Sequence, residues 1–157
     1  MGFFSWLESS GLAIWIGESL WGYPIALTCH AVGMAVMVGL VAVVDLRVAG
    51  FFNVVSLESM RKALTIAWWG FGLNVISGFS LFTSQATYFI THKAFLVKLV
   101  AIILAAINAY ILHRMLRTES TTWDANGVAS SKAKKLAISS LLLWLIAVIA
   151  GRLIAYV

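Results

Sequence analysis

The sequence of 157 residues has few of the groups with which a water-soluble protein covers its surface. Charged side chains make up 11% of the residues and hydrophobic ones 62%, whereas soluble domains are about a quarter charged and about half apolar. A small soluble protein leaves much of its chain exposed and needs polar groups there. The composition therefore excludes a soluble enzyme and a disordered tail.

Cysteine and proline occur once each. The single thiol, Cys29, cannot close an internal disulfide, and without a Cys-x-x-Cys pair the chain lacks the usual ligands of zinc, iron–sulfur and dithiol redox centres. The single proline, Pro24, suits the first turn of a helix, where a missing backbone N–H costs nothing.

Carboxylates are also scarce, with six Asp and Glu residues in total. They do not form a chain of carboxylates across the bilayer, as a proton relay would need. No serine or cysteine has a histidine three or four residues away on a helix that could act as its general base. We therefore expect that the chain is not an enzyme on its own.

Long uncharged runs dominate the sequence. Residues 19–44 and 63–91 carry no formal charge, and each run exceeds the roughly 20 residues with which a helix crosses a bilayer. Two further apolar stretches each contain one basic residue, Lys98 in one and Arg152 in the other. Helices satisfy their own backbone hydrogen bonds in lipid. The sequence therefore predicts an all-α integral membrane bundle of four transmembrane helices, at about 20–44, 63–85, 94–113 and 136–156.

The remaining segments predict the topology. Residues 3–17 mix bulky apolar side chains with a few polar ones, as in an amphipathic helix lying in the membrane interface, and 114–135 is expected to be a polar loop. Lys and Arg are concentrated in the connections after the first and third spans, which the positive-inside rule puts in the cytoplasm, with both termini outside. The net charge of +5 thus reflects the membrane topology, and no nucleic-acid partner is expected.

We interpret residues 1–157 as one membrane domain. Its expected partners are the lipid bilayer and either other membrane subunits or further copies of the chain.

Three basic side chains fall at one depth within the predicted spans. At about 1.5 Å per residue from each helix centre, His30, Lys98 and Arg152 lie roughly 4 to 9 Å from the midplane, in the outer half. An ionisable group inside the bilayer costs about 2.5–3.5 kcal/mol on insertion scales, so each one is expected to have a partner or a role.

A b-type haem would account for this set. Haem needs an imidazole for its iron, small residues where the porphyrin meets a helix, and cations for its two propionates. His30 is the expected iron ligand, Gly33 supplies space on the same helix face, and Lys98 and Arg152 are the expected propionate partners. The corresponding function is electron transfer, or a cofactor-bearing subunit of a larger membrane complex.

Other interpretations of the same residues remain open. His30 can hydrogen-bond to a neighbouring helix at Asn74 or Ser77, as in a structural subunit or homo-oligomer without a cofactor. The basic residues can bind a quinone or a small anion. His30 with Met34 and Met37 offers the imidazole and thioether ligands that suit Cu(I), and Cys29 adds a thiolate that points about 100° away from His30.

Four segments, together covering nearly the whole chain, resemble in the same order a family of small bacterial four-helix integral membrane proteins known only as a domain of unknown function. They are WLESSGLAIWIGESLWGYP, HAVGMAVMVGLVAVVDLR, AFLVKLVAIILAAINAYILHR and SLLLWLIAVIAGRLIAYV. The residues that carry the resemblance are Glu18, His30, Gly33, Asp45, Leu46, Arg47, Lys98, Asn108, Gly151, Arg152 and Tyr156. It implies the four-helix topology and a place in the bacterial inner membrane, and it implies no activity. A looser likeness links the chain to four-helix b-type cytochromes and to the membrane domain of copper-resistance proteins of the D type, both of which use more histidines.

Overall fold

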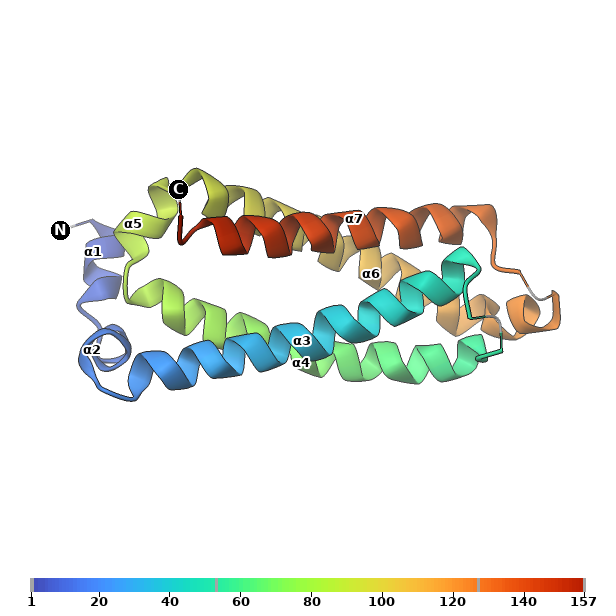
Figure 1. The fold of residues 1–157 in the computed structure, drawn as a ribbon, viewed down its shortest axis with the longest axis horizontal. Helices are drawn as coiled ribbons and strands as arrows, with labels where there is room; N and C mark the ends of the chain where they lie inside the picture. The colour runs from blue at the N-terminus through green and yellow to red at the C-terminus, as the bar shows by residue number, and fades with distance from the viewer. Residues whose placement is uncertain (1, 53, 127, 157) are drawn as a thin grey trace.

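The computed structural model describes residues 2–52, 54–126 and 128–156, which form a bundle of helices (Figure 1). The chain is 86% helical, without strands among the described residues. Four helices are long and apolar enough to cross a membrane: α3 (Gly22–Ala49), α4 (Leu57–Thr83), α6 (Lys93–Asn126) and α7 (Ser131–Leu153). The all-α prediction of four transmembrane helices is confirmed, and the chain is a multi-pass membrane protein.

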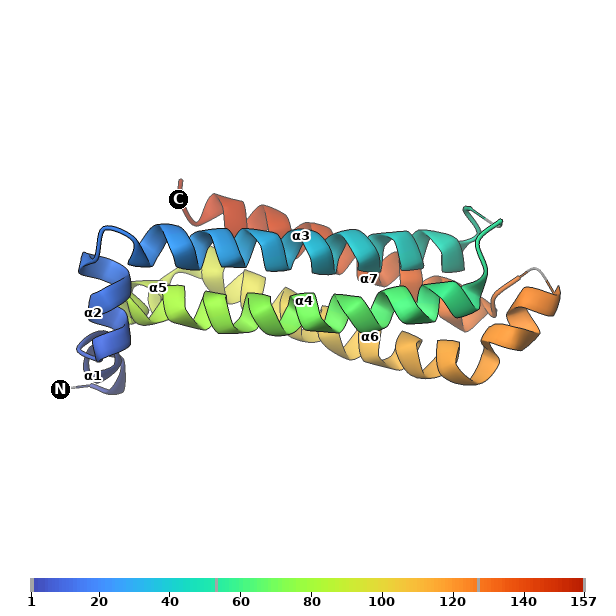
Figure 2. The same ribbon diagram turned by 90° about the horizontal axis from the view of Figure 1, so that it is seen from below.

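Three short helices gather at the end of the bundle where both termini lie, which we call the terminal end (Figures 1 and 2). They are α1 (Phe3–Glu8), α2 (Gly11–Glu18) and α5 (Ala86–Thr91). The opposite end, where α3 connects to α4 and α6 to α7, is called the loop end.

The N-terminal segment differs from the single interfacial helix that the sequence predicts over 3–17. The hydroxyl of Ser10 accepts a hydrogen bond from the backbone N–H of Ala13 at 3.2 Å, so Ser10 caps a new helix and the segment divides into α1 and α2. Glu8 then ties α1 to α5, because its Oε1 accepts hydrogen bonds from the backbone N–H and the hydroxyl of Thr87, at 2.9 and 2.7 Å.

α3 starts in close contact with α2. A Cβ atom at Gly22 would clash with the carbonyl oxygen of Trp15, so only glycine allows this corner. Pro24 lies in the first turn of α3, as its sequence position predicts. The helix ends at Gly50, whose φ of 115° is the left-handed cap that glycine adopts without strain.

α3 packs mainly against α4, and small residues bring these two helices together. A Cβ at Gly33 would lie 2.9 Å from the backbone nitrogen of Asn74, and one at Gly70 would lie 3.0 Å from that of Met37. The side-chain amide of Asn74 also donates to the carbonyl of His30 at 2.8 Å. The backbones of α3 and α4 are therefore in direct contact, as in other small-residue helix pairs of membranes.

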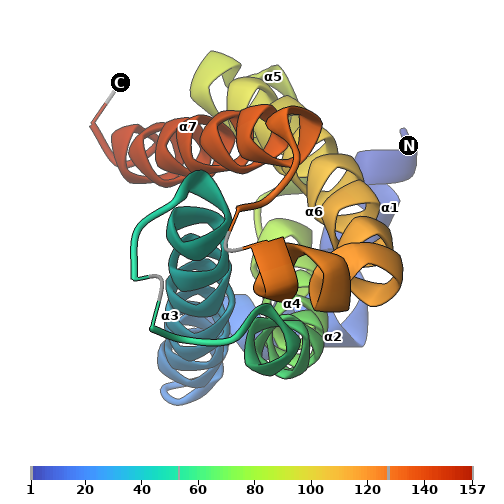
Figure 3. The same ribbon diagram turned by 90° about the vertical axis from the view of Figure 1, so that its right-hand side faces the viewer.

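α6 packs mainly against α7 in the same way. Both helices carry buried alanines: Ala101, Ala105 and Ala109 on α6, and Ala133, Ala137, Ala147 and Ala150 on α7. Asn108 secures the pair, since its Nδ2 donates to the carbonyl of Leu136 at 2.9 Å and to the hydroxyl of Ser139 at 2.8 Å. In the end-on view α3 and α4 lie side by side, and α6 and α7 run obliquely across them as the second pair (Figure 3).

The connection between α6 and α7 is much shorter than the loop predicted over 114–135. α6 continues to Asn126, and the hydroxyl of Ser130 caps α7. The sequence from 114 to 126 contains neither glycine nor proline, and Leu116 and Trp123, seven residues apart on one helix face, are buried. The polar composition of this segment thus belongs to the exposed side of a helix that extends α6 at the loop end.

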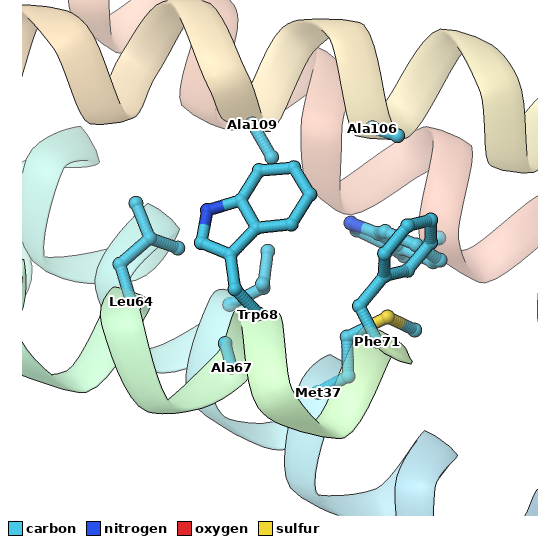
Figure 4. Close-up of a pocket in the computed structure, with 9 residues that line it drawn as sticks. Met37, Leu64, Ala67, Trp68, Phe71, Ala106 and Ala109 are labelled. Carbon is cyan, nitrogen blue, oxygen red and sulfur yellow. The ribbon is translucent and has the colours of Figure 1, made fainter. Parts of the chain in front are cut away.

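Aromatic rings fill the space between the two pairs in the middle of the bundle (Figure 4). Trp68 and Phe71 of α4 pack edge to face, with centroids 5.5 Å apart, and extend toward Ala109 and Ala106 of α6. The void that remains there is about 10 Å³ and has an apolar lining. This volume is at the lower limit for a single water molecule, so the rings close the centre of the bundle.

Candidate functional site

A cavity of about 350 Å³ lies between the two helix pairs, on the terminal side of the aromatic layer. This volume falls in the range of roughly 300–1,000 Å³ that is usual for small-molecule sites. All four long helices and α5 contribute to its wall. The lining residues are His30, Met37, Phe71, Asn74, Val75, Gly78, Phe79, Phe82, Ile90, Phe95, Lys98, Leu99, Ile102 and Trp144.

The cavity adjoins the lipid-facing surface of the bundle. Three of its lining side chains, Val75, Phe79 and Leu99, are also exposed on that surface, at 50%, 54% and 37%. A ligand dissolved in the bilayer can therefore reach the cavity sideways, between α4 and α6.

Stacked phenylalanines form the wall of the cavity toward the terminal end. Phe82 of α4 lies parallel to Phe95 of α6, with centroids 5.5 Å apart and an interplanar angle of 10°. It also contacts Phe79 and Phe89, with centroid distances of 6.5 and 6.3 Å. Flat aromatic walls of this kind favour a flat ligand.

His30 lines the cavity and is held in one orientation by α4. Its Nδ1 lies 3.1 Å from the carbonyl oxygen of Asn74 and 3.3 Å from the hydroxyl of Ser77. Gly78 provides the space for the ring, since a Cβ there would lie 2.9 Å from Cε1 of His30. The predicted hydrogen bond from His30 to the neighbouring helix is confirmed, and it involves both of the expected residues.

This hydrogen bond determines which ring nitrogen of His30 carries the proton. A carbonyl oxygen only accepts, so Nδ1 is the N–H donor to Asn74, and Nε2 of the neutral ring keeps a free lone pair. Nε2 has no hydrogen-bond partner among the residues that the structure describes. His30 therefore offers the cavity an acceptor, or a ligand for a metal ion.

Lys98 lines the same cavity from α6. Its stem packs on Gly151 of α7, where a Cβ would lie 3.4 Å from Cδ, Cε and Nζ. Neither a hydrogen bond nor an ion pair links its ammonium to a described residue, and the cavity wall contains no carboxylate. A cation in an apolar wall without a counter-charge is costly, and a ligand with an oxygen acceptor would offset that cost.

The other predicted site residues lie elsewhere. Gly33 faces the backbone of α4 and serves the helix contact. Arg152 is exposed, donates to the hydroxyl of Tyr156 at 2.8 Å and stacks over its ring. Met37 reaches the cavity, whereas Met34 is not among its lining residues. The structure thus unites His30 with Lys98 and separates both from Gly33 and Arg152.

The described residues of the cavity wall offer an iron ligand on one side of a haem but no ligand on the opposite side. The bare Nε2 of His30 suits an iron ligand, but Met37, the other ligand-type side chain in the wall, lies seven residues further along the same helix and thus on the same side. His113 lies at the loop end, between α4 and α6, and His92 precedes α6 near Tyr88. Among the described residues, no group of three or more His, Cys, Asp or Glu side chains could hold a metal ion.

Comparisons with known proteins do not identify the chain, because no family model, curated protein or solved structure matches it.

The cavity also includes residues that were not predicted as site residues, Gly78 and the phenylalanines at 79, 82 and 95. Their spacing along α4 gave one signal, because Gly78 and Phe82 lie four and eight residues after Asn74 on one helix face.

Proposed function

We propose that this membrane protein binds a quinone, a flat ring with two oxygen substituents and an apolar tail, in the cavity between its helix pairs. The observation that carries the proposal is that Lys98 and Nε2 of His30, neither of which has a partner among the described residues, lie in one aromatic, lipid-accessible cavity. A quinone is a substrate of electron transfer, which is the function class that the sequence predicts.

Each polar group matches one part of a quinone. The ammonium of Lys98 donates a hydrogen bond to a ring oxygen, and a hydrogen bond to a charged group contributes about 1.5–3 kcal/mol. At the other oxygen, Nε2 of His30 accepts a hydrogen bond from the hydroxyl group of the reduced quinone. The rings of Phe82 and Phe95 pack against the head group, and the tail leaves past Phe79 into lipid.

A b-type haem is the second candidate function, and the bond from Nδ1 of His30 to a backbone carbonyl favours it. Metal-ligating histidines are usually held in this way, which exposes Nε2 to the metal. Bound haem would supply one-electron chemistry, with His30 as its ligand and Lys98 near a propionate. Quinone ranks first because it requires neither an opposing ligand nor the second cation, Arg152, which lies outside the cavity wall.

Two variants of His30 separate binding from packing. In His30→Asn the side-chain amide occupies the place of Nδ1 and keeps a donor for Asn74, but no atom replaces Nε2. In His30→Gln the amide reaches the place of Nε2 instead. We expect His30→Asn to keep the stability of the wild type and lose ligand affinity, and His30→Gln to do the reverse.

The ligand is identified with purified protein in detergent. Decylubiquinone binding is measured by titration calorimetry, and a visible spectrum is recorded before and after dithionite. Lys98→Met should raise the dissociation constant about tenfold or more, the equivalent of a charged hydrogen bond, while the matched variant Lys93→Met at the exposed start of α6 should not. A Soret band that disappears in His30→Asn would support haem over quinone. If the protein binds neither ligand and neither ligand raises its stability, it is a structural subunit and the proposal is wrong.

A further inference from the structure

A basic surface lies at the loop end, where α4 and α6 run side by side (Figure 2). It consists of two adjoining hollows that share His113 and Arg117. Arg61 and Lys62 of α4 and Arg114 of α6 complete the basic lining, in which the described residues include no acidic side chain. We call this surface the basic hollow. It is remote from the quinone cavity, from which the aromatic layer separates it.

The basic hollow has an apolar side that is aligned with the membrane. Trp68 lies seven residues after Arg61 on α4, and Tyr110 lies seven residues before Arg117 on the antiparallel α6. At 1.5 Å per residue, both helices therefore place an aromatic ring about 10 Å closer to the bilayer centre than the arginine. The same sequence of groups, charge followed by apolar surface, occurs along a phospholipid from its phosphate to its acyl chains.

Exposed apolar side chains surround the basic hollow on its membrane side. Trp69 beside Trp68 is 80% exposed, and Ile66 and Ile107 are exposed by 55% and 53%. Such side chains face acyl chains when the four helices span a membrane. An occupant of the hollow therefore lies at the boundary between water and lipid, which is the position of a phospholipid head group.

We propose that the basic hollow is a binding site for the phosphate of an anionic phospholipid, whose acyl chains lie along Trp68 and Tyr110. Arg114 and Arg117, both exposed, are the principal phosphate ligands, because the arginine fork matches phosphate oxygens. Basic pockets between transmembrane helices commonly bind lipid head groups of this class.

The experiment uses the full chain in detergent and measures lipid adducts by native mass spectrometry. Dioleoyl phosphatidylglycerol is titrated in one series and dioleoyl phosphatidylcholine, of the same tail and no net charge, in another. The double variant Arg114→Gln/Arg117→Gln is compared with Lys132→Gln/Lys135→Gln, which removes two exposed charges from α7 at the same end of the bundle. Inorganic phosphate is added as a competitor in a parallel series.

We expect phosphatidylglycerol to bind to the wild type in preference to phosphatidylcholine, and the arginine variant to bind it about tenfold or more weaker. The lysine variant should keep most of the affinity. Equal losses in both variants would mean that net charge alone attracts the lipid and would overturn the site. Equal binding of both lipids would overturn the phosphate contact, and complete displacement by an equimolar amount of inorganic phosphate would identify the ligand as a free anion.

Discussion

The contact between α3 and α4 predicts a large effect from one added methyl group, in Gly33→Ala. The new Cβ would lie 2.9 Å from the backbone nitrogen of Asn74 and 3.0 Å from the carbonyl oxygen of Gly70, and neither backbone atom can turn aside. The helices must therefore separate by several tenths of an ångström. This movement weakens the two bonds between His30 and Asn74, now 3.1 and 2.8 Å long.

The expected loss is about 2–4 kcal/mol of unfolding free energy, from overpacking at roughly 1–3 kcal/mol and two interhelical hydrogen bonds at about 0.6 kcal/mol each. Reversible unfolding by SDS in mixed micelles measures this quantity. Gly39→Ala is the matched control, because it adds the same methyl group to the same helix where no atom lies within 4 Å. Equal stability of the two variants would refute the close contact of the helix backbones.

Two further predictions concern the other contacts between helices. Asn108→Ala should lower the unfolding free energy by about 1 kcal/mol, because the bonds from Nδ2 to Leu136 and Ser139 are both lost, and the same SDS titration measures it. The contact of α1 with α5 should depend on pH, because the hydrogen bonds from Thr87 lower the pKa of Glu8 below its ordinary value of 4.5. A lowered pKa stabilises the contact above that value, and the contribution is lost as the pH falls through the folded-state pKa, which spin labels on α1 and α5 should report as a longer distance.

Each of these two predictions has its own control. Ser139→Ala removes one of the two acceptors of Asn108 and should cost about half as much as Asn108→Ala. Glu8→Gln has no carboxylate, so its spin-label distance should not change with pH in the acid range. A change of distance that persists in Glu8→Gln would assign the acid sensitivity to another group.

The sequence predicts the four spans because four apolar stretches, two of them uncharged and two with a single basic residue, are long enough to cross a bilayer. It does not predict that α6 continues to Asn126, since the polar segment after His113 has the composition of a loop and only Leu116 and Trp123 indicate a buried face. The polar composition of this segment comes from the exposed side of the helix. Two buried residues seven positions apart are too few to distinguish a helix from a loop.

Two of the four predicted binding residues could be assigned to the cavity from their depth in the membrane spans alone. His30 and Lys98 lie at similar depths in their spans and meet in one cavity, but Arg152, at a comparable depth, is exposed and bound to Tyr156. The reason is rotation about the helix axis: consecutive residues are about 100° apart, so Gly151 faces Lys98 and Arg152 turns away. Distance along a span can be counted from the sequence, whereas the face that each helix turns to its neighbours depends on packing.

The cavity is a consequence of the way in which the helices pair. Small residues lie between α3 and α4 and are buried on α6 and α7, and the aromatic layer fills the space between the two pairs in the middle of the bundle. Toward the terminal end the phenylalanines cover the space without filling it, which leaves the cavity. His30 belongs to both features, because its Nδ1 bonds α3 to α4 and its ring lines the cavity, where Nε2 has no partner among the described residues. If the cavity binds the proposed ligand, stability and binding depend on different nitrogens of one ring. A substitution that keeps only one of the two nitrogens then distinguishes a structural histidine from a functional one.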